Sequence, residues 1–368
     1  MDFDAPMVWI VDSAYTGELH ARLGVAERLG YGYETIPLPN GDVGAYASLL
    51  ENRYGHACLD GEPRPLILLS GTGEDTIGPF ADLKGVFHGR LLNVYLASIL
   101  PDELDPRLQE YDLIASPQLS GANVVTTVGV VHRMTERLLS QAFQRHRDLF
   151  AGLARPLVGL LVGGNTRYCF GFHEDHARCL GRRVASVVTS LRGGLVVTNS
   201  RRTPKEALAA LLDEVAGLEY RFFDWQQTGP DFYPALLAHS DVLVATGDSV
   251  SMCSEASYTG KPLLVDIRDC ATEIYHRHII GKLIAYGAAK PLGDTFQPWT
   301  YTPPDPTGAV VAAIHERLVE KWLFFSREGK SRKIGGISGT QRVSGDGLNP
   351  PTEDKCASQI KRRRLAGR

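Results

Sequence analysis

DVLVATGDSVSMCSEASYTGKPLLVD, residues Asp241–Asp266, is the stretch that decides the fold of this chain. Val242–Ala245 is a short apolar run with β-branched residues, which is typical of a strand buried on both faces of a parallel sheet. Small polar residues follow it, and a helix can begin at once. Gly260 and Pro262 end that helix, because glycine suits the left-handed turn after a helix and proline cannot continue it. The apolar run Leu263–Val265 comes next, so the stretch predicts strand, loop, helix and strand.

The loop of this stretch also predicts an anion site. Ser249 or Ser251 can cap the helix, whose first N–H groups and positive dipole end attract negative charge. Ligands of open α/β sheets bind at the carboxyl ends of the strands, so a phosphate would meet the loop that holds Asp248. Glu255, one turn further on, could accept hydrogen bonds from a ribose. The alternative is an ordinary strand–helix–strand unit with Glu255 on a solvated helix face, since such loops are common.

Length and charge predict two domains and a distinct tail. A chain of 368 residues suits two domains of roughly 150 residues each. From Arg327 onward there are eleven Lys/Arg and four Asp/Glu, a balance of +7, so a total of −3 leaves −10 on residues 1–326. We expect domains at 1–154 and 155–305, a final helix at 306–326, and a disordered basic tail at 327–368.

Composition narrows the class of protein. Hydrophobic residues make up 43% and charged residues 22%, as in soluble globular proteins. No apolar run approaches the ~20 residues of a membrane helix, and the acidic start MDFDAPMVW is unlike a basic leader. The six cysteines lack the spacing of a zinc site. We expect a cytoplasmic protein without a bound metal. Its basic tail could hold the protein at the inner face of an anionic membrane, with a binding free energy of about 1 kcal/mol per basic side chain. A solvated terminus is the alternative.

The first half offers three candidates for a catalytic base. Met7–Val11 predicts a strand, and Glu18 and His20 lie in the first turns of the helix that follows. Asp75 lies in the loop after the predicted strand Leu66–Ser70. Carboxylates there would suit the hydroxyls of an acceptor. The alternatives are a Glu18 that complements the helix dipole and an acidic loop that faces solvent.

Two further loops of the second half lie at the same predicted sheet edge as Asp248. The strand Leu157–Val162 leads into Gly163, Gly164 and Asn165, and two glycines let backbone N–H groups approach a diphosphate closely. A strand that ends at Thr198 leads into Ser200, Arg201, Arg202 and Thr203, where the two guanidinium groups suit diphosphate oxygens. A tight turn and a pair of surface arginines are the alternatives. Together, however, the three loops predict one site for a nucleoside diphosphate.

These segments resemble the mitochondrial-fission "elongated mitochondria" family, whose bacterial members are assigned as glycosyltransferases of the GT-B fold. The resemblance is carried by three motifs, LVGG at 161–164, TNSRRTP at 198–204 and VATGDSVSMCSEASYTGKPLLV at 244–265. It implies an α/β, GT-B-like fold, with two Rossmann-like parallel-sheet domains facing a central cleft and a C-terminal helix that crosses back to the first.

The resemblance also implies a function. The expected activity is transfer of a sugar to an acceptor hydroxyl, in envelope glycan or glycolipid assembly. The co-substrate would be a nucleotide-diphosphate sugar, with no other bound cofactor, and the acceptor a sugar or a lipid-linked sugar; no nucleic-acid partner is expected. Gly163, Gly164, Arg201, Arg202, Ser249 and Ser251 would face the diphosphate, and Glu255 the ribose. The alternatives are a nucleotide-sugar epimerase and a non-catalytic scaffold related to organelle fission.

Overall fold

The structure is a computed structural model of the chain. It describes residues 5–13, 15–38, 42–57, 64–71, 77–87, 89–97, 105–229 and 231–334, with side chains through residue 321. The chain divides into two compact units, Met1–Trp322 and Leu323–Arg368, and the described part of the second is the end of one long helix.

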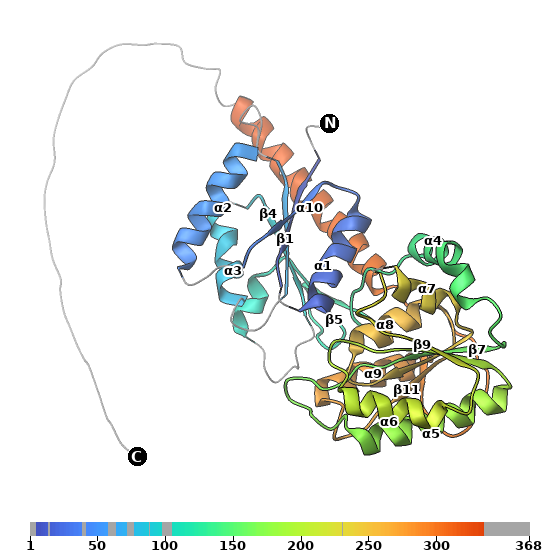
Figure 1. Cartoon of the computed structure of the whole chain (residues 1–368). Helices are drawn as coiled ribbons and strands as arrows, with labels where there is room; N and C mark the ends of the chain where they lie inside the picture. Colours follow the sequence, from blue (N-terminus) through green and yellow to red (C-terminus); the bar gives the residue numbers. More distant parts are fainter. Residues whose placement is uncertain are drawn as a thin grey trace, which may run out of the picture. The chain divides into compact units, whose positions relative to one another are not determined.

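Two six-stranded sheets lie within the first unit, and every described pair of neighbouring strands is parallel (Figure 1). The strands of the first sheet are β1 (Met7–Val11), β2 (Tyr33–Ile36), β3 (Leu66–Ser70), β4 (Leu91–Leu96), β5 (Leu113–Ser116) and β6 (Val124–Thr126). Those of the second are β7 (Leu157–Leu161), β8 (Gly194–Thr198), β9 (Tyr220–Phe223), β10 (Val242–Thr246), β11 (Leu263–Asp266) and β12 (Ala289–Pro291). The predicted α/β fold class with two Rossmann-like sheets is confirmed.

The strand order places one switch point in each sheet. The first sheet runs β2-β1-β3-β4-β5-β6, and the second runs β12-β11-β10-β7-β8-β9. The chain therefore leaves β1 and β3 in opposite directions across the first sheet, and β7 and β10 in opposite directions across the second. Crevices at such points, outside the carboxyl ends of the strands, are where doubly wound sheets bind ligands.

The inner strands of each sheet, such as β3, β7 and β10, are buried on both faces, which explains why they are continuous apolar runs. Side chains alternate between the two faces of a strand. In β1, Trp9 and Val11 join one core cluster while Val8 and Ile10 join another. The strands β7 and β10 divide in the same way between the two core clusters of the second sheet.

Helices cover both faces of the first sheet. One face packs against α1 (Thr16–Leu29) and the start of α10 (Pro306–Ile334), and the other against α2 (Val43–Ala57) and α3 (Ile77–Val86). Val310 and Ile314 of α10 are fully buried in the same core cluster as residues of β1, β3, β4 and β5, so the final helix returns to the first sheet as expected. The helix continues past Arg327, into the segment expected to be disordered, and ends at Ile334; residues 335–368 lie outside the described residues.

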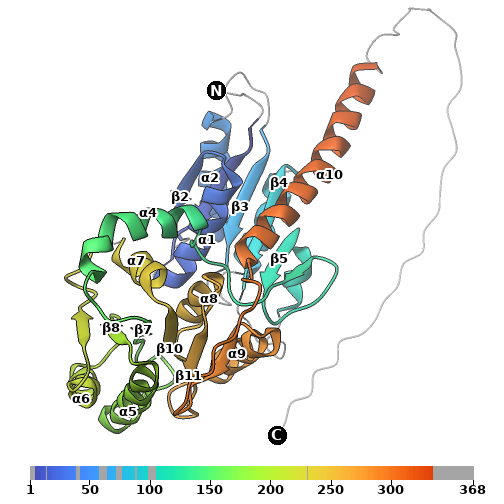
Figure 2. The same ribbon diagram turned by 90° about the vertical axis from the view of Figure 1, so that its right-hand side faces the viewer.

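The second sheet is covered in the same way. One face packs against α5 (Glu174–Leu191) and α6 (Lys205–Val215), which lie side by side in both views (Figures 1 and 2). The helices on the other face are α4 (Glu136–His146), α7 (Phe232–His239), α8 (Val250–Tyr258) and α9 (Ile274–Tyr286). The strand–loop–helix–strand prediction for Asp241–Asp266 is confirmed as β10, α8 and β11, with Gly260 in the left-handed region at φ 73°.

Candidate functional site

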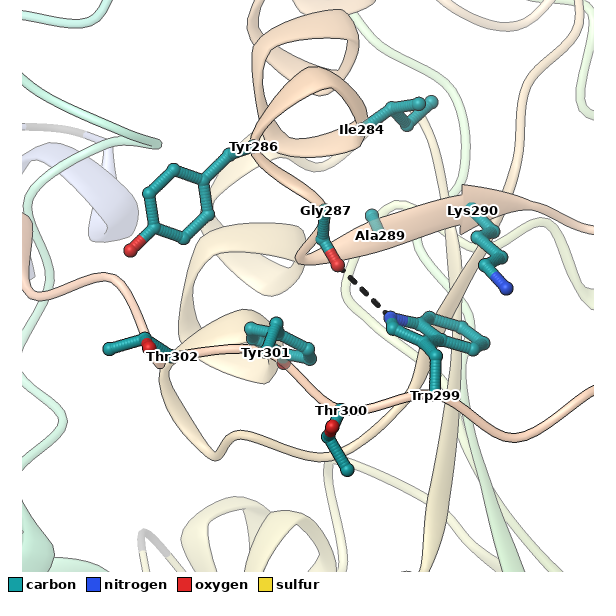
Figure 3. Close-up of a pocket in the computed structure, with 9 residues that line it drawn as sticks. All are labelled: Ile284, Tyr286, Gly287, Ala289, Lys290, Trp299, Thr300, Tyr301 and Thr302. Carbon is teal, nitrogen blue, oxygen red and sulfur yellow. Dashed lines mark hydrogen bonds between the residues drawn. The ribbon is translucent and has the colours of Figure 1, made fainter.

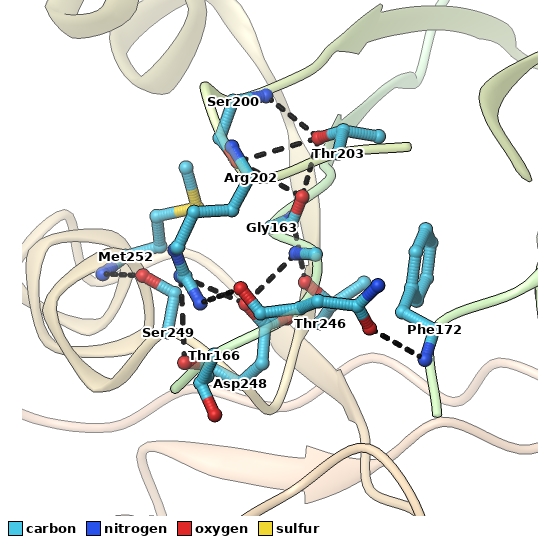
Figure 4. Close-up of polar contacts among 12 residues, drawn as sticks. Gly163, Thr166, Phe172, Ser200, Arg202, Thr203, Thr246, Asp248, Ser249 and Met252 are labelled. Carbon is cyan, nitrogen blue, oxygen red and sulfur yellow. Dashed lines mark hydrogen bonds and ion pairs between the residues drawn. The ribbon is translucent and has the colours of Figure 1, made fainter. Parts of the chain in front are cut away.

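The carboxyl ends of β7 and β10 are joined through backbone N–H groups. Gly163 N–H donates to Thr246 Oγ1 at 2.7 Å, and Gly164 N–H donates to Asp248 Oδ2 at 2.8 Å (Figure 4). A Cβ atom on Gly163 would come within 2.2 Å of the Asp248 carboxylate, so only glycine fits there. Gly164 has φ +156°, and a Cβ on it would lie 2.1 Å from the carbonyl oxygen of Arg202. The glycine pair thus lets this turn pack closely, and its N–H groups already have acceptors inside the protein.

The loop after β8 is tied into the same cluster. The Ser200 hydroxyl donates to the Gly163 carbonyl at 2.9 Å, and the Thr203 hydroxyl donates to the same oxygen (Figure 4). Asn165 N–H donates to the Arg202 carbonyl at 3.2 Å. The structure therefore brings the three predicted loops together at one sheet edge. Ser200, Thr203 and Asn165 act there as ties between loops, and their contact with a ligand stays a prediction.

The two adjacent arginines differ in their surroundings. The Arg202 side chain is 32% exposed, and its Nη2 lies 2.8 Å from Asp248 Oδ2 in an ion pair (Figure 4). Arg201 is exposed and forms no hydrogen bond or ion pair with any residue that the structure describes. Of the two, Arg201 alone lacks a partner within the described ranges, and its contact with an anion stays a prediction.

The first turn of α8 lies beside the first turn of α1. Ser249 caps α8 by accepting the N–H of Met252, as expected for a helix that starts directly after the loop. Ser251 lies against α1, because a Cβ atom on Gly17 would come within 2.8 Å of its Oγ. One turn later, the buried Ser254 hydroxyl accepts the N–H of Val130, at 2.9 Å, from the segment after β6. The N-terminus of α8 is therefore placed next to residues of the first half.

Glu255 is buried in α8 with only 7% of its surface exposed. Burial raises its pKa to about 7, and the neighbouring Tyr233 hydroxyl offsets this shift only in part. A carboxyl group that changes protonation near pH 7 can accept a hydrogen bond from a ribose hydroxyl or donate one to it. Contact with a ribose stays a prediction for this residue.

Glu18 and His20 lie on different faces of α1. Glu18 is half-exposed; its Oε2 accepts from the Ser13 hydroxyl at 3.0 Å and lies 3.5 Å from the guanidinium group of the buried Arg22. His20 instead neighbours Arg133 and Glu27, and its pKa is lowered, first by burial and then by Arg133. His20 therefore does not support a base at Glu18, because residues two apart on a helix face different directions. Asp75 lies outside the described residues.

Sequence reasoning missed a polar group at the start of α9. Glu273 is buried and accepts a hydrogen bond from the Thr166 hydroxyl. His276 is 5% exposed, and burial, followed by the charge of Arg202, lowers its pKa to about 3. Burial and the charge of Glu273 raise the pKa of Tyr275, while Arg202 opposes this shift and Glu18 adds to it. Position could have revealed these residues, because they follow the carboxyl end of β11 at the same sheet edge.

One cavity of the structure does not involve the predicted site residues. A cavity of about 600 Å³ lies at the end of α9 and beside β12, lined in part by Tyr286, Lys290, Trp299 and Tyr301 (Figure 3). It contains none of the predicted site residues. No cluster of three His, Cys, Asp or Glu side chains in the described ranges could hold a metal ion. Within the same ranges, no helix has the length and apolar character needed to cross a membrane.

Comparison with known proteins places the chain in a family. Residues 16–318 match the family described as mitochondrial fission ELM1. The chain belongs to the mitochondrial fission ELM1 family. The mitochondrial fission protein ELM1 of Arabidopsis thaliana is 27% identical over 207 residues, which are 54% of this chain and 46% of the plant protein. The chain therefore spans about half of that relative.

Two further comparisons cover more of the chain. An uncharacterized protein of Rickettsia prowazekii, RP120, is 21% identical over 323 residues, 77% of this ELM1-family chain and 89% of the rickettsial protein. The structure of UDP-GlcNAc 2-epimerase from Methanocaldococcus jannaschii matches with a TM-score of 0.53 and 12% identity, over 84% of this chain and 99% of the epimerase. That likeness shows the fold alone, and it confirms the GT-B-like architecture.

Proposed function

We propose that this ELM1-family protein is a nucleotide-sugar-dependent glycosyltransferase whose second sheet holds the nucleoside diphosphate of the donor. One observation carries the proposal: the loops after β7, β8 and β10 are tied into a single cluster beside the N-terminus of α8. Arg201 and Arg202 belong to the middle loop. A helix N-terminus and guanidinium groups are suited to stabilise the charge that develops on a departing diphosphate.

The position of Glu18 supports transfer to an acceptor held by the first half. Ser251 at the start of α8 lies against Gly17, and Glu18 is the next residue of α1. Both Glu18 and Arg202 influence the pKa of Tyr275, so each of them lies within electrostatic range of that residue. A carboxylate of the first sheet thus lies near the cluster proposed to hold the donor.

In the proposed reaction, the oxygen of an acceptor hydroxyl forms a bond to the anomeric carbon of the donor sugar. The bond between that carbon and the diphosphate oxygen breaks, and the hydroxyl proton passes to the Glu18 carboxylate. The electron pair leaves with the diphosphate, whose negative charge faces the N-terminus of α8 and the arginine pair. The acceptor would be a sugar or a lipid-linked sugar.

Binding of UDP-, GDP-, CMP- and dTDP-sugars to the full chain, measured by calorimetry, tests the proposal. One class of donor is expected to bind, and Arg201→Ala is expected to weaken it by about tenfold or more, because hydrogen bonds to charged groups contribute about 1.5–3 kcal/mol. Arg137→Ala on α4 removes another exposed arginine, far along the chain from these loops, and should leave the affinity unchanged.

Product analysis separates the alternatives. Formation of a glycosylated acceptor together with free nucleoside diphosphate supports the transferase. A donor that is isomerised without any acceptor would instead indicate an epimerase. The enzyme proposal is wrong if no nucleotide sugar binds and Arg201→Ala leaves the biological phenotype unchanged. A non-catalytic role, of the kind that the name of the family suggests, would then be favoured.

A further inference from the structure

Asp248 occupies the place in the loop cluster that a phosphoryl group is expected to take. Its Oδ2 atom accepts the Gly164 N–H at 2.8 Å and pairs with Arg202 Nη2 at 2.8 Å (Figure 4). A backbone N–H after a strand and a guanidinium group are the donors that recognise phosphate. In this structure a carboxylate of the protein itself holds both of them.

The carboxylate is deeply buried and only partly satisfied. Asp248 is 3% exposed, and its Oδ1 atom has no hydrogen-bond partner among the residues that the structure describes. Burial raises the pKa of Asp248, and the charge of Arg202, followed by hydrogen bonds from the Thr246 side chain and the Gly164 N–H, acts in the opposite direction. A buried charge with an unpaired oxygen is costly. An incoming anion can therefore displace the contacts of Asp248 more easily than it could displace those of a fully satisfied ion pair.

A second aspartate, at the other end of β10, makes the same kind of contacts in a more exposed place. Asp241 lies just before β10, where its Oδ2 accepts the Leu157 N–H at 2.7 Å and lies 2.9 Å from Arg155 Nη1. The two aspartates thus make the same contacts at opposite ends of β10. The Asp241 side chain is 45% exposed, whereas the Asp248 side chain is 2% exposed. Only the buried aspartate lies at the switch point of the sheet.

We propose that the Asp248 carboxylate competes with the phosphoryl groups of the ligand for Arg202 and the Gly164 N–H. By holding these donors, it sets the affinity of this site for diphosphates. The inference rests on the proposed function. To bind fully, a diphosphate must take Arg202 and the Gly164 N–H from the carboxylate, against the repulsion of like charges. The carboxylate would retake both donors when the product diphosphate leaves. A competitor of this kind would speed product release, a step that limits many enzymes.

The sign of a single substitution tests the proposal. Asp248→Asn keeps the shape and an oxygen for the Gly164 N–H but removes the charge that competes for Arg202. Asp241→Asn is the matched control, with the same change at the other end of β10. Affinities for inorganic pyrophosphate, UDP and GDP are measured by calorimetry on the full chain. We expect Asp248→Asn to bind pyrophosphate, and whichever nucleotide binds, about tenfold more tightly or better, and Asp241→Asn to match the unaltered protein.

The possible outcomes separate this inference from the proposed function. Equal or weaker binding by Asp248→Asn would overturn it, because a carboxylate that merely positions Arg202 helps binding and its loss weakens binding. The proposal would also be overturned if pyrophosphate, UDP and GDP all fail to bind both the unaltered protein and Asp248→Asn. A gain for pyrophosphate without any binding of UDP or GDP would support it while contradicting the nucleotide site. Asp248→Ser, whose hydroxyl can also accept the Gly164 N–H, should show the same gain if Asp248→Asn does not fold.

Discussion

The switch points of the two sheets differ in the side chains that lie at them. At the second, between β7 and β10, three loops are tied by hydrogen bonds, and the carboxylate of Asp248 is buried against Arg202. At the first, between β1 and β3, the Glu18 side chain is 38% exposed, accepts a hydrogen bond from Ser13 and pairs with Arg22. A closed polar cluster with a helix N-terminus suits a charged group that must be held in place. A half-exposed carboxylate suits an exchange of protons with a bound hydroxyl.

The two edges also share one feature, a glycine within a few residues of the end of a strand at the switch point. Gly71 follows β3 with φ +139°, and a Cβ on it would lie 2.1 Å from the Leu96 carbonyl oxygen. Gly164 follows β7 with φ +156° and meets the Arg202 carbonyl oxygen at the same distance. The backbones of neighbouring loops therefore approach equally closely at both edges. The difference between the edges lies in the side chains, which is where a division between acceptor chemistry and donor binding would arise.

Glu18→Gln should show the largest effect, because it removes the proposed base while leaving the donor edge untouched. Transfer is expected to slow by about 10²–10⁴-fold, the range typical of a lost general base. The Kd of the nucleoside diphosphate should stay the same. Rates and affinities are measured on one preparation. The comparison of the two edges fails if the substitution weakens nucleotide binding as much as it slows transfer.

Alanine at the two glycines tests whether the edges are equally rigid but functionally distinct. Gly71→Ala and Gly164→Ala should each lower the free energy of unfolding by about 3 kcal/mol, because each places a methyl group against a backbone carbonyl at positive φ. Urea unfolding measures this loss, and Gly217→Ala, which meets nothing within 4 Å, is the control. Only Gly164→Ala should also weaken binding of the nucleoside diphosphate. Equal effects of both substitutions on binding would contradict the assignment of the donor to the second edge.

The sequence predicted the second edge more completely than the first for a physical reason. Continuous apolar strands followed by Gly163, Ser200 or Asp248 place those residues at one edge of any parallel sheet, whatever the details. The pairing of Arg202 with Asp248 could not be predicted, because the two residues are 46 positions apart and no local pattern records which side chain turns inward. The same holds for the burial of Glu273 and His276 at the start of α9, because no local pattern records which side chains of that turn face inward.

The first edge shows the opposite limit. Helical spacing alone places Glu18 and His20 on different faces of α1, so the sequence already indicates that His20 is not a partner of Glu18. The surroundings of Glu18 depend instead on Arg22, which is buried and donates to the Asp12 carbonyl at 3.0 Å. A buried arginine on an amphipathic helix is contrary to the usual pattern. Its position follows from the tertiary fold rather than from the helix itself.

The smallest expected effect is a change of stability with pH that belongs to Glu255. Its pKa is raised to about 7 in the folded protein, above the roughly 4.3 of an unfolded chain. The folded state therefore binds more protons between these values, and the free energy of unfolding should fall as the pH rises through this window, by about 1–2 kcal/mol between pH 5 and 7. His132 and His276, with pKa values lowered from about 6.5 to about 3, act in the opposite direction between these values, a window that overlaps that of Glu255. The difference between the unaltered protein and Glu255→Gln isolates the carboxyl group, since both share these histidines.

A bound ribose that donates hydrogen bonds to the Glu255 carboxylate would lower its pKa and flatten this difference. Urea unfolding with and without saturating nucleoside diphosphate therefore shows whether Glu255 faces the ligand. An unchanged pH profile with the nucleotide bound would remove Glu255 from the donor edge.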